Sequence, residues 1–153
     1  MAGIKPIPDG ASSVTPHLVI AGAAQAIDFY TRAFGAVEKF RLPTPEGRLM
    51  HAEIRVGNST VMLVDDFPEH GSRSPPTLGG TPITLHLYVE DADAVLARAA
   101  AAGARVIMPV QEMFWGDRYG VVEDPFGHRW SIATHVRDLS PEEIARAAAA
   151  AMA

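Results

Sequence analysis

The stretch Val14–Leu18, which reads VTPHL, returns in the second half of the chain as Ile83–Leu87, which reads ITLHL, and this repeat decides the fold. Each copy predicts a short strand that runs into a helical segment, and these segments end at Gly35 and Gly103. A pattern that occurs twice predicts a duplicated supersecondary unit, because a solenoid needs at least three repeats. Two paired units would build a concave surface with a ligand site between them.

The composition of the chain limits its function. Its 153 residues suit one domain, and 48% hydrophobic residues are ample for a core. A net charge of −5 argues against a nucleic-acid partner, which requires a basic surface. The absence of cysteine excludes disulfides and thiolate chemistry and agrees with a reducing cytoplasm. With no signal segment or membrane-spanning apolar run in the sequence, we expect a soluble cytoplasmic protein.

The order of apolar segments and turn signals predicts an α+β fold with two tandem βαβββ modules. The predicted divisions are an N-terminal arm at 1–13, a first module at 14–66, a Pro/Gly/Ser-rich linker at 67–82, a second module at 83–138 and a C-terminal helix at 139–153. Asp91 is a predicted N-cap of the second module's helix, and Ser140 with Glu143 forms a capping box.

Alternation along each predicted strand separates an apolar face, which the helices would cover, from a polar face. On this count Met50 and Ala52 belong to the helix-covered face of strand 50–56. The polar face receives four of the six histidines: His17, His51, His86 and His135. If the sheet is curved, these residues line its hollow. The alternative is a sheet surface that simply meets water or a partner subunit.

Four motifs resemble the vicinal oxygen chelate superfamily, also called the glyoxalase/bleomycin-resistance/extradiol-dioxygenase group. They are Ala26–Gly35 (AIDFYTRAFG), Leu85–Asp91 (LHLYVED), Trp115–Gly120 (WGDRYG) and Glu123–Ile132 (EDPFGHRWSI). The last two resemble the PhnB-like branch most closely. The resemblance implies paired βαβββ modules that form a U-shaped mixed sheet around a site, and commonly a homodimer.

The resemblance also implies where a metal would bind, and the chain departs from that pattern. Metal-dependent members draw histidines from the first strand of each module and carboxylates from the last. The matching positions here are Thr15, Thr84 and Ser131, with the fourth near Met62. Threonine, serine and methionine do not replace imidazole and carboxylate ligands. We therefore predict a small-molecule-binding member without the standard metal and with no cofactor.

Two alternatives to this prediction stay open. His17, His86 and Glu53 form a displaced set that would hold a divalent metal, as in a lyase, isomerase or dioxygenase. The chain would otherwise be a non-catalytic dimeric scaffold. Glu53 is the candidate general base if the protein is an enzyme.

The predicted ligand contacts come from the hollow and from one loop. The hollow residues are Thr15, His17, Glu53, Thr84, His86, Tyr88, Ser131 and His135, and the loop 115–119 adds Trp115, Arg118 and Tyr119. An aromatic, a cation and a phenol together suit a planar or anionic ligand. The alternative is that Trp115 plugs the end of the sheet and Asp117 pairs with Arg118. His128 is assigned a structural role, and His70 no specific role.

Overall fold

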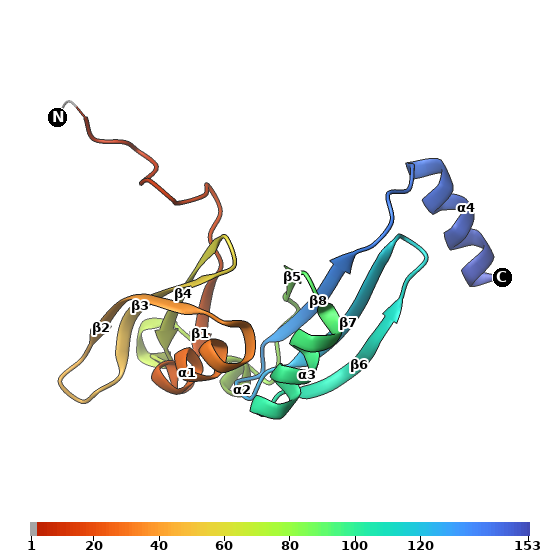
Figure 1. Ribbon diagram of the computed structural model, residues 1–153. Coiled ribbons are helices and arrows are strands. Elements are labelled where there is room, and N and C mark those ends of the chain that lie inside the picture. Colours follow the sequence, from red (N-terminus) through yellow and green to blue (C-terminus); the bar gives the residue numbers. More distant parts are fainter. Residues whose placement is uncertain (1–2) are drawn as a thin grey trace. The chain divides into compact units, whose positions relative to one another are not determined.

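A computed structural model describes residues 3–153, and the chain divides into two compact units between Thr81 and Pro82. In each unit one helix lies against one face of its own four-stranded sheet (Figure 1). None of the helices within 3–153 is long and apolar enough to cross a membrane. Each unit is described by itself.

The first unit contains one βαβββ module. Its elements are β1 (His17–Ile20), α1 (Ala23–Phe34), β2 (Val37–Pro43), β3 (Leu49–Val56) and β4 (Ser59–Asp65). The strand order is β1-β4-β3-β2, with β1 parallel to β4 and the other pairs antiparallel. The segment that follows β4 holds a 3-10 helix, η1 (Pro68–His70), and a short helix, α2 (Pro75–Leu78).

The second unit repeats the same topology. Its elements are β5 (Thr84–Tyr88), α3 (Ala92–Ala102), β6 (Arg105–Glu112), β7 (Asp117–Glu123), β8 (Arg129–His135) and the terminal helix α4 (Pro141–Met152). The order β5-β8-β7-β6 and the parallel β5–β8 pair match the first sheet element by element. The predicted α+β fold with two βαβββ modules is therefore confirmed.

The predicted helix boundaries are confirmed by their hydrogen bonds. The Asp91 carboxylate accepts from the Ala94 amide at 3.1 Å, which caps the start of α3. Ser140 and Glu143 each accept a hydrogen bond from the other's backbone amide, so α4 begins with the expected capping box. Gly35 ends α1 with a φ of 68°, a conformation that glycine adopts without strain.

The core of each unit lies between its helix and one face of its sheet. In the first unit Phe29 and Tyr30 of α1 are fully buried together with Ile54 and Leu63 of the sheet. In the second unit Ala92 and Ala99 of α3 are buried, as are Val122, Trp130 and Ile132 of the sheet. We call the opposite side of each sheet its open face.

One residue assignment within β3 was wrong. Met50 was predicted to face the helix, but it is 56% exposed, and its neighbour Leu49 is 1% exposed. The cause is a β-bulge, because Leu42 pairs with His51 whereas Pro43 pairs with Leu49. The extra residue between these two pairs is Met50. A bulge interrupts the period-2 alternation on which the prediction rested.

The first strand of each unit is also shorter than predicted. β1 begins at His17, and Val14, the first residue of the predicted strand, is 85% exposed. The Pro16 carbonyl still accepts a hydrogen bond from the Met62 amide at 2.9 Å, but proline has no N–H to donate to the sheet. β5 begins at Thr84, and Ile83 before it is exposed.

Candidate functional site

The open face of the first sheet carries a row of side chains that crosses all four strands. His17 of β1 pairs with Met62 of β4, Met62 pairs with Glu53 of β3, and Glu53 pairs with Phe40 of β2. Since paired residues on neighbouring strands point to the same side, the row forms one continuous surface. It combines imidazole, thioether, carboxylate and phenyl groups.

A second histidine on the same face, His51, contacts both Glu53 and His17 of this row. Its Nε2 lies 3.0 Å from Oε2 of Glu53, and its ring meets the His17 ring edge-on at 5.6 Å between centroids. Partial burial, followed by the nearby His51, lowers the pKa of His17 below 6.5. A neutral His17 is therefore favoured near pH 7, and its ring can either donate or accept a hydrogen bond.

The open face of the second sheet carries an aromatic cluster centred on His86. Nδ1 of His86 lies 2.6 Å from the buried hydroxyl of Ser131 on the neighbouring strand. Tyr88 meets the His86 ring edge-on at 4.6 Å, and Tyr119 stacks on it at 5.9 Å. Trp115 extends the cluster by packing edge-on against Tyr119 at 5.3 Å. These rings form an aromatic surface of edge-on and stacked contacts, with the His86 and Ser131 hydrogen-bonding groups inside it.

A buried carboxylate lies next to this cluster. Asp117, whose side chain is 5% exposed, lies 2.8 Å from Nδ1 of His135 and accepts a hydrogen bond from the Tyr88 hydroxyl at 3.4 Å. The other ring nitrogen of His135 lies 2.7 Å from Asp138. Hydrogen bonds to Asp138 and Asp117 raise the pKa of His135 above 6.5. Loss of water contact and the Asp117 charge raise the pKa of Tyr88 above 10.

Asp117 was missed as a site residue, and its predicted pairing with Arg118 was wrong. Arg118 instead binds Asp93 at the start of α3 through two hydrogen bonds of 2.8 and 2.9 Å. Both residues belong to β7, not to a loop, so their side chains point to opposite faces. Counting alternation two residues back from Tyr119 would have placed Asp117 on the open face.

The remaining predicted residues lie at the margins. Thr15 precedes β1, and Thr84 is exposed at the start of β5, where it pairs with Arg129.

His128, predicted to be structural, is buried directly after the turn that begins at Asp124. The Asp124 carboxylate accepts hydrogen bonds from the His128 amide and from the Trp130 indole, at 3.0 Å each.

The residues at the standard metal positions do not fit a divalent ion. Met62 lies beside His17, and the Ser131 hydroxyl is bound to His86, so a thioether and a hydroxyl stand where carboxylates would be required. Of the displaced set, His17 and Glu53 belong to the first unit and His86 to the second, and Glu53 is bound to His51. Within residues 3–153, no group of three or more His, Asp or Glu side chains is arranged to hold a metal.

Comparison with known proteins defines the family. The model of the Glyoxalase/Bleomycin resistance protein/Dioxygenase superfamily matches residues 14–132, and the chain belongs to this superfamily. An uncharacterized protein of Mycobacterium tuberculosis is 52% identical over 135 residues, which cover 86% of this chain and 79% of the relative.

Solved structures agree with this assignment. TioX from Micromonospora sp. ML1 is 29% identical with a TM-score of 0.66, over 82% of this chain and 100% of that one. The PhnB protein from Bacillus cereus, at 19% identity and a TM-score of 0.64 over 80% of this chain and 99% of that one, shares the fold. The predicted resemblance to the superfamily, with PhnB-like neighbours, is confirmed.

Proposed function

We propose that this chain is a small-molecule-binding member of the superfamily that holds its ligand against the open face of a sheet without the standard metal. The observation that carries the proposal is the cluster around His86 on the second sheet. An aromatic cluster that contains a Ser–His pair and borders a buried carboxylate is typical of ligand sites, in which apolar walls surround a few placed polar groups.

The chemistry of the cluster suggests a planar ligand with polar substituents. Tyr119 and Trp115 offer ring faces and edges for stacking. His86 and Ser131 offer hydrogen bonds, and the Asp117–His135 pair at the cluster's edge offers one donor or acceptor more. We leave Arg118 out of this set, because Asp93 on the helix side already engages its guanidinium.

On the first sheet, we propose that His17 and Glu53 contact the same class of ligand, with Thr15 at the margin, and on the second sheet Thr84 lies at the margin of the His86 cluster. The contact of Glu53 with the His51 ring holds that carboxylate in place, and Glu53 is the candidate general base if the ligand is turned over.

The proposal is tested by ligand-dependent melting. A panel of planar aromatic acids, amides and phenols is screened by thermal shift, because a ligand that binds only the folded state raises the melting temperature. The best compound is then titrated calorimetrically into the wild type and into Tyr119→Ala and His86→Ala. Each substitution should weaken binding about tenfold or more, which is about 1.4 kcal/mol.

The matched control is Arg118→Ala, which changes the residue next to Tyr119 but on the helix side. It should bind the compound as the wild type does. Equal loss of binding in Arg118→Ala and Tyr119→Ala would contradict the open face as the binding surface, and no melting shift with any compound would contradict the planar-ligand proposal.

The metal-dependent alternative has its own test. Protein grown with added iron, zinc and manganese is analysed for metal beside a His17→Ala/His86→Ala variant. We expect no stoichiometric metal in either. About one metal per chain that is lost in the variant would replace our proposal with a metal-dependent lyase, isomerase or dioxygenase.

We also propose that the protein is a cytoplasmic homodimer. The edge strand β2 exposes Val37, Phe40 and Leu42, and exposed apolar groups on an edge strand favour association. Light scattering after size-exclusion chromatography tests this proposal, and a monomer at all concentrations would contradict it.

A further inference from the structure

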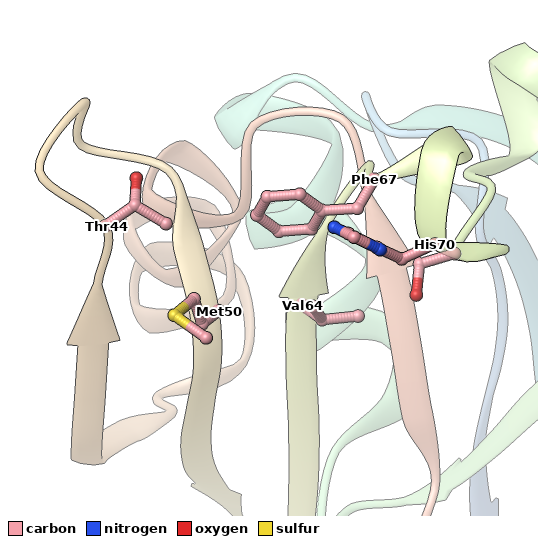
Figure 2. A pocket seen from close by; sticks show the side chains of 6 residues that line it. Thr44, Met50, Val64, Phe67 and His70 are labelled. Atoms are coloured by element: carbon pink, nitrogen blue, oxygen red, sulfur yellow. The ribbon is translucent and has the colours of Figure 1, made fainter.

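A cavity of about 340 Å³ lies in the first unit, among residues that the proposed function does not use. It is lined by Thr44, Met50, Val64, Phe67, His70 and Ser72. Figure 2 shows Met50 and Val64 on adjoining strands of the sheet, with Phe67 and His70 on the segment that follows β4. Val64 lies between the buried residues Leu63 and Asp65 of β4, so its side chain is on the open face.

The floor of this cavity depends on the bulge in β3. Because Met50 is the extra residue, Leu49 enters the core and Met50 turns to the open face. The bulge is anchored by the Leu49 amide, which donates to the Asp65 carboxylate at 2.7 Å. Bulges of this kind redirect a side chain and are frequent beside functional sites.

The wall of the cavity is a closed turn. Phe67 and Ser72 exchange two backbone hydrogen bonds of 2.9 and 3.1 Å, so the chain from Phe67 to Ser72 folds back on itself. The guanidinium carbon of Arg48 lies 4.1 Å from the centre of the Phe67 ring and holds that ring in position. The wall is therefore built by specific contacts.

The lining residues indicate what the cavity would accept. None of the six is a carboxylate, a lysine or an arginine, and the neighbouring Arg48 already pairs with Glu69 at 3.8 Å. A thioether, an isopropyl group and a phenyl ring favour an apolar aromatic guest. The Thr44 hydroxyl oxygen is buried and has no hydrogen-bond partner among the described residues, so a rotation of this side chain toward the cavity would supply one hydrogen bond.

We propose that this cavity is a binding site for a small uncharged aromatic molecule of one or two rings that carries a single hydroxyl or amine. The ring system packs between Met50, Val64 and Phe67, and its polar group bonds at Thr44 or at the rim residues His70 and Ser72. The volume lies at the lower end of the range for small-molecule sites, which agrees with a ligand of this size.

The test is calorimetric titration of the full chain with 2-naphthol, with cyclohexanol as the aliphatic comparison. We expect saturable binding of 2-naphthol at one site and binding of cyclohexanol at least about fivefold weaker. Val64→Phe, which fills the cavity, should weaken 2-naphthol binding about tenfold or more. The matched control Thr60→Ala changes the same strand and face outside the cavity and outside the row of His17, Met62, Glu53 and Phe40, and should change the affinity by less than about twofold.

A second filling variant keeps the test decisive if Val64→Phe does not fold. Met50→Trp changes an exposed side chain at the bulge and should also weaken 2-naphthol binding about tenfold. The inference would be overturned by no saturable binding to the wild type, by cyclohexanol binding as tightly as 2-naphthol, or by a folded filling variant that binds like the wild type. It is independent of the His86 cluster, so loss of ligand binding there leaves these expected results unchanged.

Discussion

The two βαβββ modules place side chains at matching positions but fill those positions differently. In the parallel strand pair of each module, His17 lies beside Met62 in the first and His86 beside Ser131 in the second. The next position across the sheet is Glu53 in the first module and Val121 in the second. The first open face is therefore a mixed acidic and apolar surface, whereas the second is a hydrogen-bonded aromatic one. Duplication preserved the backbone register and left the chemistry free to diverge.

The helix starts of the two modules show the same divergence. Asp65 of β4 accepts hydrogen bonds from the amides of Gly22 and Ala23 at 3.0 Å each, and Leu49 donates to its second oxygen. At the matching position of β8, Thr134 accepts from the Ala92 amide at 2.8 Å and donates to a carbonyl of the preceding loop. On the neighbouring strand, one module anchors its helix start with a carboxylate and the other with a hydroxyl, which acts beside the Asp91 cap of α3.

The largest effect that we predict comes from removing these anchors. Asp65→Ala leaves three amides without partners in a buried place and should lower the free energy of unfolding by about 3–5 kcal/mol. Thr134→Val keeps the shape of the side chain and should cost about 1–2 kcal/mol. Urea unfolding of both variants measures the difference, and equal losses would show that the charge on Asp65 adds nothing.

Helix packing on the sheet gives the next effect. Gly120 of β7 faces α3, and a Cβ there would lie 2.6 Å from the Leu96 side chain and 2.9 Å from Val110. Gly120→Ala should therefore lower the free energy of unfolding by about 2–3 kcal/mol. The matching residue of the first module is Ala52, which is fully buried, and Ala52→Gly should cost about 1 kcal/mol. If Gly120→Ala leaves the free energy of unfolding in urea unchanged, α3 must be able to shift away from the added Cβ.

A smaller effect is expected inside the aromatic cluster. Ser131→Ala removes the 2.6 Å partner of His86 and should cost about 1 kcal/mol of unfolding free energy. Released from this bond, the His86 ring should also give broader or shifted resonances in NMR spectra. Unchanged stability together with unchanged His86 resonances would remove the Ser–His pair from the proposed site.

The smallest effects are opposite pH dependences in the two modules. The lowered pKa of His17 means that its contribution to stability is present above pH 6.5 and is lost as the pH falls through its folded pKa. The raised pKa of His135 means that its contribution is present below pH 6.5 and is lost as the pH rises through its folded pKa. NMR titration should find His17 below and His135 above 6.5, and the reverse order would contradict both assignments.

The fold was predictable because its signals are local. Helical periodicity, the glycine ends of α1 and α3, the Asp91 cap of α3 and the capping box of α4 act within a few residues and therefore appear directly in the amino-acid order. The face of Met50 was not predictable, because the bulge exists only in the pairing of β3 with β2. The position of Asp117 was missed for a different reason, since the start of β7 was taken for a loop.

The sequence by itself determined the duplicated βαβββ plan and the superfamily, because each rests on residue identity at a known spacing. Tertiary structure alone decided which side chains meet: His86 with Ser131, Asp117 with His135, and Met50 with Phe67 around a cavity. These contacts join residues from separate strands and loops. Their distances depend on register, bulges and turns, which no single segment of the chain encodes.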